Sequence, residues 1–134
     1  MINIIHPTAN LYDSCVIGEN TKIGAFSEIG KNVIIGKNCS IGFGVFIPEN
    51  VIIEDNVFIG PGTVFTNDKY APSKGKWREM PPTIVRTGTT IGANCTILPN
   101  ITLEEGCRIE AGSVVTKSVK QNTIVFGNPA KEKK

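Results

Sequence analysis

The chain contains a single histidine, His6, in 134 residues. A zinc site that needs several imidazoles therefore cannot be assembled from one copy of the sequence. The four cysteines show no Cys-x-x-Cys spacing, which removes the other common zinc pattern. We expect no metal, and we expect His6 to be a surface or packing residue of the first repeat.

Long apolar runs and a large excess of one charge are also missing. No apolar stretch approaches the roughly 18 residues of a membrane-spanning helix, and residues 1–10 lack the basic and then apolar segments of a secretory signal. Acidic and basic residues are mixed along the chain and leave a net charge of +2. We therefore expect a protein that binds neither membranes nor nucleic acid.

What the sequence does contain is an apolar residue at every sixth position. The repeat runs through Ile5, Leu11, Ile17, Ile23, Ile29, Ile35, Ile41, Ile47, Ile53, Ile59 and Phe65, and resumes through Val85, Ile91, Ile97, Leu103, Ile109 and Val115. On a helix, sixth residues lie about 240° apart and form no single buried face, so a helix is excluded. On strands, where alternate residues share a face, a period of six requires short extended pieces separated by corners.

The positions beside these apolar residues support that geometry. Two residues earlier the side chain is small or β-branched, from Cys15 to Ser113, and we expect each such pair to point inward together. Three residues later the chain carries Asn or Gly, which tolerate the left-handed backbone of a tight corner. Phe26 is the exception at the corner. It either packs its ring over the turn or contacts a ligand or another subunit.

Repeats such as residues 35–40 and 91–96 resemble the hexapeptide repeat of the left-handed parallel β-helix acyltransferases, and the likeness extends over about residues 5–130. It implies an all-β fold, a left-handed parallel β-helix of about six triangular coils of 18 residues, and a homotrimer. The left hand runs against the usual crossover rule and rests on the resemblance alone. Residues 1–134 are accordingly predicted to form a single domain with one extruded loop, residues 66–84.

All four cysteines occupy the small inward position of the repeat. Cys15, Cys39, Cys95 and Cys107 stand where Thr, Ser and Val stand elsewhere. Cys15 and Cys39 are not separated by a multiple of 18 residues, and neither are Cys95 and Cys107, so neither pair should stack on adjacent coils. We predict reduced core residues in a cytoplasmic protein.

The repeat is broken once, between Phe65 and Val85. This step of twenty residues is not a multiple of six, so part of residues 66–84 must leave the coil as a loop, a common place for function. The loop holds the only tryptophan, one of two tyrosines and four basic residues: Trp77, Tyr70, Lys69, Lys74, Lys76 and Arg78. Rings and cations together suit an anionic ligand that carries a planar base. On composition alone, a solvated loop with incidental charge is equally open.

Residues 57–68, and residues 82–86 after the loop, are similar to the branch that N-acetylates amino sugars attached to nucleotides. The resemblance implies that Asn67 and Asp68 contact the acceptor sugar and are the catalytic candidates. Phe65 is expected to end the core column that includes Ile29 and Ile47. The predicted substrate-binding residues are Asn67, Asp68, Lys69, Tyr70, Trp77 and Arg86.

The C-terminal end carries the other half of the resemblance. Residues 127–131 look like the closing turn that lies near coenzyme A in the family, and residues 111–117 look like part of its last full coil. Residues 93 and 111 are 18 positions apart, so they should stack on adjacent coils and leave a groove for the pantetheine arm. Lys117 and Lys131 are then expected to pair with the phosphates of the coenzyme. The predicted acetyl-CoA-binding residues are Ala93, Ala111, Lys117, Gly127, Asn128, Pro129 and Lys131. The alternative is a capped end of the rod with solvated lysines.

The absence of a histidine from the loop bears on the mechanism. Members of the resembled family that acetylate hydroxyls generally use a histidine base, whereas His6 lies far along the chain from the loop. An amine needs only to be in its neutral form to attack, so an amine acceptor is favoured over an alcohol. The prediction is direct attack of a sugar amine on the acetyl thioester, with its proton passing to solvent, the departing thiolate or Asp68.

The sequence therefore predicts an acetyl-CoA-dependent sugar N-acetyltransferase. Asn67, Asp68 and Lys69 most resemble enzymes that act on dTDP-linked 3-amino-3,6-dideoxyhexoses. A UDP-linked amino sugar and a non-catalytic β-helix module stay open as alternatives. The γ-class carbonic anhydrases share the fold, but one histidine cannot supply their zinc ligands.

Overall fold

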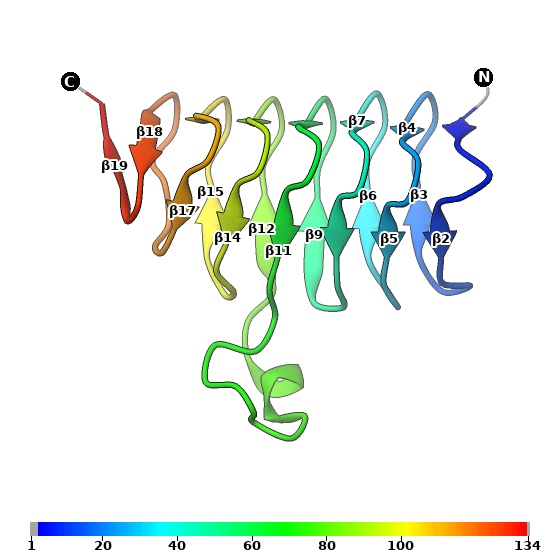
Figure 1. The fold of residues 1–134 in the computed structure, drawn as a ribbon, viewed down its shortest axis with the longest axis horizontal. Coiled ribbons are helices and arrows are strands. Elements are labelled where there is room, and N and C mark those ends of the chain that lie inside the picture. The colour runs from blue at the N-terminus through cyan, green and yellow to red at the C-terminus, as the bar shows by residue number, and fades with distance from the viewer. Residues whose placement is uncertain (1–2, 134) are drawn as a thin grey trace.

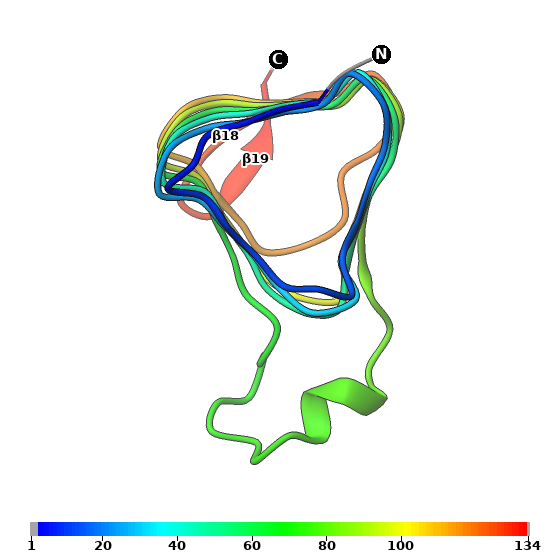
Figure 2. The same ribbon diagram turned by 90° about the vertical axis from the view of Figure 1, so that its right-hand side faces the viewer.

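The computed structural model describes residues 3–133 and shows a rod of stacked triangular coils, with one loop leaving a corner midway along it (Figures 1 and 2). Viewed from the N-terminal end, the chain turns counterclockwise as it recedes, which is a left-handed helix (Figure 2). The predicted all-β fold, coil shape and hand are confirmed.

Three parallel sheets form the three sides of the rod. The first contains β1 (Ile4–Ile5), β4 (Lys22–Ile23), β7 (Ser40–Ile41), β10 (Phe58–Ile59), β13 (Thr90–Ile91), β16 (Arg108–Ile109) and β18 (Ile124–Gly127), with β19 (Ala130–Glu132) antiparallel to β18. The second contains β2 (Asn10–Leu11), β5 (Glu28–Ile29), β8 (Phe46–Ile47), β11 (Val64–Phe65), β14 (Thr96–Ile97) and β17 (Val114–Val115). The third contains β3 (Val16–Ile17), β6 (Ile34–Ile35), β9 (Val51–Ile53), β12 (Thr83–Val85) and β15 (Thr102–Leu103).

The coils follow one another in threes, β1 to β3, β4 to β6, and so on. A bridge between Leu103 and Val119 closes the third side of the sixth coil, and β18 begins a seventh. The prediction of about six coils is confirmed, with one further side added at the C-terminal end.

The inward positions form the core, as the repeat predicts. The column from Ile23 to Val115 is buried, and the small residues two places earlier are buried with it, including Thr21 and Ser113 at 0% exposure. Phe65 is also fully buried in the column of Ile29 and Ile47, as predicted, but it does not end that column, because it pairs with Ile97 and Ile97 pairs with Val115. Each buried aliphatic side chain contributes roughly 1.5–3 kcal/mol by transfer from water. Ile5 in the first coil stays 37% exposed because no coil covers it on the N-terminal side.

The cysteines are free and belong to the core. Cys39, Cys95 and Cys107 are buried and Cys15 is partly buried. Burial raises the pKa of each thiol above its ordinary value, so the reactive thiolate is disfavoured. The prediction of core packing is confirmed.

The corners adopt the left-handed backbone that Asn and Gly favour. Every predicted corner position has a positive φ: Asn20, Phe26, Asn32, Asn38, Gly44, Asn50, Asn56, Gly62, Gly88, Asn94, Asn100, Gly106 and Gly112. Phe26 takes it as well, at φ 60°, and its side chain is 76% exposed, so the ring does not pack over the turn. The contact with a ligand or subunit stays a prediction.

The loop is two residues shorter than predicted at its C-terminal end. Thr83 and Ile84 belong to β12, so the loop is residues 66–82 and contains the 3-10 helix η1 (Lys76–Glu79). Thr83 is 1% exposed at the small inward position, and Ile84 pairs with Ile52 and Thr102 on the coils to either side. The coil therefore resumes as soon as the repeat allows it.

Candidate functional site

The loop projects from one corner of the rod and contacts the third coil through two side chains (Figure 2). Asn67 Nδ2 donates to the carbonyl oxygen of Glu49 at 3.2 Å, and the Arg78 guanidinium lies 3.9 Å from the Glu49 carboxylate. Asn67 is the residue that follows Glu49 by 18 positions, so stacking of the coils brings the two together. Two clefts lie beside the loop, and Trp77 lines both.

The sheet-side cleft lies between the loop and the second sheet and has a volume of about 290 Å³. Trp77, Arg78 and Asn67 line it from the loop, and Tyr12 and Phe46 line it from the coils. Arg78 covers the Trp77 ring, with its guanidinium carbon 4.3 Å from the ring centroid. Aromatic faces and cations meet here, as the loop composition indicates.

The loop cleft lies within the loop itself and has a volume of about 300 Å³. Asp68, Lys69, Tyr70 and Trp77 line it, so four of the six predicted substrate-binding residues share this cleft. Tyr70 is 72% exposed, and the Lys69 ammonium lies 5.5 Å from its ring centroid.

Asp68 has one bonded and one unbonded carboxylate oxygen. Oδ2 accepts a hydrogen bond from the backbone N–H of Ser73 at 2.9 Å, while Oδ1 is buried and has no hydrogen-bond partner among residues 3–133. A buried acceptor without a partner costs free energy, so such an atom is a natural place for a donor from a ligand. An amine or ammonium is such a donor.

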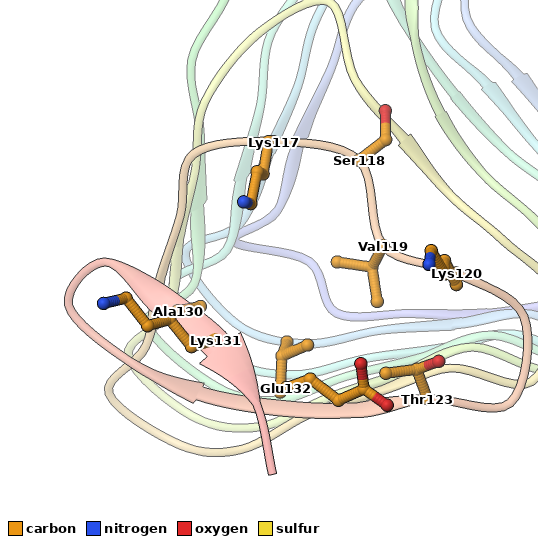
Figure 3. Close-up of a pocket in the computed structure, with 9 residues that line it drawn as sticks. Lys117, Ser118, Val119, Lys120, Thr123, Ala130, Lys131 and Glu132 are labelled. Atoms are coloured by element: carbon orange, nitrogen blue, oxygen red, sulfur yellow. The ribbon is translucent and has the colours of Figure 1, made fainter.

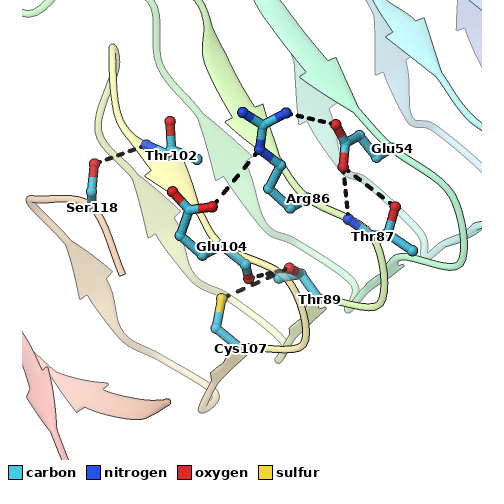
Figure 4. Close-up of polar contacts among 8 residues, drawn as sticks. All are labelled: Glu54, Arg86, Thr87, Thr89, Thr102, Glu104, Cys107 and Ser118. Atoms are coloured by element: carbon cyan, nitrogen blue, oxygen red, sulfur yellow. Dashed lines mark hydrogen bonds and ion pairs between the residues drawn. The ribbon is translucent and has the colours of Figure 1, made fainter. Parts of the chain in front are cut away.

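Arg86 is placed apart from the other predicted substrate contacts. It lines neither cleft, and it pairs with Glu54 at 2.8 Å and Glu104 at 3.8 Å on the neighbouring coils (Figure 4). Burial acts to raise the pKa of Glu54, but hydrogen bonds from Arg86 and Thr87 outweigh it and hold that pKa below its ordinary value. The geometry gives Arg86 a role in joining three coils, and a role in substrate binding stays a prediction.

The predicted coenzyme residues gather at the C-terminal end of the rod. Lys117 and Lys131 line one pocket of about 240 Å³, together with Lys120 (Figure 3). Asn128 and Pro129 form the turn between β18 and β19, and Gly127, the last residue of β18, has φ 100°.

The two predicted alanines lie on adjacent coils of the same corner. The backbone N–H of Gly112 donates to the carbonyl oxygen of Ala93 at 2.8 Å, and Ala111 lines a shallow groove on the first sheet. The closing turn reaches the same corner, because the Gly127 N–H donates to Ser113 Oγ at 3.1 Å.

Sequence reasoning missed the coil residues of the sheet-side cleft and Lys120. Tyr12, Phe46 and Glu49 become visible only when the coils are aligned at 18 residues, which places Glu49 beneath Asn67. Lys120 lies in the last coil, where the step from Arg108 to its partner Ile124 is shorter than 18 residues.

The described part of the chain holds neither a metal-binding cluster nor a membrane-spanning helix. Residues 3–133 contain no cluster of three His, Cys, Asp or Glu side chains able to hold a metal ion. None of the helical segments within that range has the length and apolar character needed to cross a bilayer.

Comparison with known proteins is consistent with this geometry. The family model for bacterial transferase hexapeptide (six repeats) matches residues 14–49, 32–67 and 82–117. The chain is 34% identical over 73 residues to 2,3,4,5-tetrahydropyridine-2,6-dicarboxylate N-acetyltransferase of Staphylococcus aureus, an alignment covering 54% of this chain and 28% of that protein. It is 42% identical over 50 residues to a provisionally named acetyltransferase of Schizosaccharomyces pombe, covering 37% of this chain and 24% of that protein. The chain thus spans about a quarter of the length of these relatives.

Solved structures share the fold at lower identity. A histidine-to-alanine variant of GDP-perosamine N-acetyltransferase from Caulobacter crescentus, in complex with CoA and GDP-perosamine, superposes with a TM-score of 0.87 at 22% identity, over 100% of this chain and 57% of that one. AntD, an N-acyltransferase from Bacillus cereus in complex with dTDP and 3-hydroxybutyryl-CoA, superposes with a TM-score of 0.86 at 22% identity, over 98% of this chain and 79% of that one.

Proposed function

Because the chain belongs to the bacterial transferase hexapeptide family, we propose that it transfers an acetyl group from acetyl-CoA to the amine of a nucleotide-linked amino sugar. The observation that carries the proposal is the buried, unpartnered Oδ1 of Asp68, a residue that lines a cleft together with lysine and aromatic residues. The fold neighbours that hold CoA with GDP-perosamine, or dTDP with an acyl-CoA, support it.

The acceptor is assigned to the loop. Asp68 accepts a hydrogen bond from the sugar amine. Asn67, Lys69 and Tyr70 lie in the same part of the loop. Trp77 offers a ring on which the nucleotide base can stack. A dTDP-linked 3-amino-3,6-dideoxyhexose is the first choice of acceptor, and a UDP-linked amino sugar is the second.

The donor is assigned to the C-terminal end. Ala93, Ala111 and the turn of Gly127 to Pro129 would follow the pantetheine arm, and Lys117 and Lys131 would pair with coenzyme phosphates. The loop leaves the fourth coil and Val115 belongs to the sixth, so the two sites are separated along the rod by roughly 10 Å at about 4.8 Å per layer.

The reaction needs no metal. The neutral amine attacks the thioester carbonyl carbon, a C–N bond forms, the C–S bond breaks, and the thiolate leaves. The proton lost by nitrogen passes to Asp68, to the thiolate or to solvent. A carboxylate in hydrogen-bond reach of the amine can act as the general base.

The proposed protein is a homotrimer located in the cytoplasm. The four free thiols would stay reduced there. Aliphatic side chains on the outward face of the third sheet, including Val16 at 58% and Ile34 at 46% exposure, support association of copies. Sedimentation equilibrium of the purified chain tests the trimer, and a monomer at micromolar concentration would exclude it.

Release of free thiol from acetyl-CoA tests the function across a panel of dTDP-linked and UDP-linked amino sugars. We expect release with an amino sugar nucleotide and none with the matching hydroxyl sugar. A non-catalytic β-helix module would release no thiol with any member of the panel.

A further inference from the structure

Two corner asparagines fasten the returning end of the loop. Asn50 Nδ2 donates to the carbonyl oxygens of Met80 at 3.2 Å and Pro81 at 3.4 Å. Asn100 Nδ2 donates to the same Pro81 oxygen at 2.6 Å. One carbonyl group therefore receives amides from the third coil and from the fifth, on either side of the coil that carries the loop.

The repeat explains why the loop leaves the coil at this corner. Asn50 and Asn100 hold their own corners in left-handed backbone, at φ 79° and 67°. In the coil between them the aligned position is Pro82, because Thr83 pairs with Val51. A proline ring fixes φ near about −65°, so a left-handed corner cannot form there. The two flanking amides then face the carbonyl group of Pro81.

A stiff segment connects Trp77 to Pro81, whose carbonyl oxygen is held by the clamp of Asn50 and Asn100. Proline at positions 81 and 82 removes backbone freedom, and a residue before proline is held in extended backbone, as Met80 is at φ −87° and ψ 156°. The Met80 N–H donates to the Trp77 carbonyl oxygen at 3.1 Å. A displacement at Pro81 is therefore passed to Trp77, which lines both clefts.

Packing gives the loop little other support. The helix η1 has no buried residue, and the Arg78 side chain that pairs with Glu49 is 59% exposed. Exposed ion pairs at such distances contribute little. The orientation of the loop then depends on Asn67 at its outgoing end and on the two asparagines at its returning end.

We propose that Asn50 and Asn100 are positioning residues, whose amide groups set the orientation of Trp77 and thereby the shape of the two clefts beside it. The consequence for the acceptor rests on the proposed function, whereas the consequence for the loop does not.

The test compares two substitutions of Asn100 with a substitution of the corner asparagine at the matching position of another coil. Asn100→Asp keeps the size and the tolerance of left-handed backbone but replaces the donor by an acceptor. Asn100→Gly removes the side chain and suits the backbone at least as well, which keeps the chain folded. Asn32→Asp is the control, because Asn32 occupies the same corner in the second coil, at φ 60°, with an exposed side chain.

Tryptic cleavage of the folded protein after Lys69, Lys74 or Lys76 should quicken about 5- to 30-fold in both Asn100 variants, since cleavage follows the population of opened loops. The fluorescence anisotropy of Trp77, the only tryptophan, should fall. With a dTDP-linked 3-amino-3,6-dideoxyhexose as the probe, the KM for the acceptor should rise while the KM for acetyl-CoA stays unchanged.

Cleavage and anisotropy equal to those of Asn32→Asp would overturn the clamp. An unchanged acceptor KM in a loosened loop would overturn its positioning role. If the wild type acetylates no amino sugar nucleotide, the proposed function fails, and cleavage and anisotropy still decide whether the asparagines hold the loop.

Discussion

Asp68 combines an observed structural contact with a proposed chemical role. Its Oδ2 closes a turn of the loop through Ser73, which fixes the carboxylate, and its Oδ1 is buried without a partner among the described residues. A fixed carboxylate beside a cleft is suited to accept a proton from an amine that comes within hydrogen-bond reach.

Asp68→Asn removes the base but keeps an oxygen for the Ser73 N–H. If the carboxylate takes the proton, kcat should fall by about 10²- to 10⁴-fold, with little change in the KM for acetyl-CoA. Steady-state thiol release measures both constants. Asp13→Asn, at an exposed position of the first coil, is the control. Near-normal turnover in Asp68→Asn would remove Asp68 as the base and leave solvent or the thiolate.

Charge at the C-terminal pocket can be tested in the same assay. Reversal of both Lys117 and Lys131 to Glu should raise the KM for acetyl-CoA by about tenfold or more, because charge-assisted hydrogen bonds to phosphate are lost. Lys37→Glu, on the exposed surface of the second coil, should leave it unchanged. An unaltered KM in the double variant would mean that these lysines are only solvated.

At the scale of the coil, close stacking explains the glycines that follow the aliphatic repeat. A Cβ added at Gly60 would lie 2.6 Å from the backbone nitrogen of Ala93 on the next coil. Real Cβ atoms do not approach a backbone so closely, so the coils would have to separate. Gly44 differs, because a Cβ there would meet nothing within 4 Å.

Gly60→Ala should therefore destabilise the rod by about 1–3 kcal/mol, as overpacking does elsewhere. Gly44→Asn is the matched change, since φ 59° at Gly44 suits Asn, and it should stay within about 0.5 kcal/mol of the wild type. Thermal unfolding followed by circular dichroism compares the two. Equal melting temperatures would contradict the stacking explanation.

The Arg86 cluster joins coils through charge, and its effect should depend on pH. The pKa of Glu54 is lowered in the folded chain, so its contribution is present above the unfolded pKa and is lost as pH falls through the folded value. Glu54→Gln should lower the melting temperature at neutral pH, and the difference should shrink below pH 4.5, the ordinary value. A difference that persists unchanged in acid would show that the ion pair is not its source.

The fold was predictable at this scale because the repeat of six residues specifies both the inward-facing side chains and the corner of each side of the coil. The buried column of Ile29, Ile47 and Phe65 and the left-handed Asn corners follow directly from residue type and spacing. The clefts were only partly predictable. Asn67 and Trp77 are in the loop, but the path of the loop has no period, so the approach of Glu49 and the capture of Pro81 by two asparagines required the folded chain.

The whole molecule consists of a regular stacked scaffold and two irregular segments. The loop of the fourth coil carries the candidate acceptor site, and the hairpin of β18 and β19 carries the candidate donor site (Figure 1). The stacked core between them fixes their separation, which the proposed thioester arm would have to cross.

The most direct test of this division is one reaction: acetyl-CoA with a dTDP-linked 3-amino-3,6-dideoxyhexose, in which free thiol and acetylated sugar are both measured. We expect the two products in equal amounts, with the acetyl group on nitrogen by mass spectrometry and NMR. No thiol release with any dTDP-linked or UDP-linked amino sugar, or an acetyl group on oxygen, would contradict the proposed N-acetyltransferase.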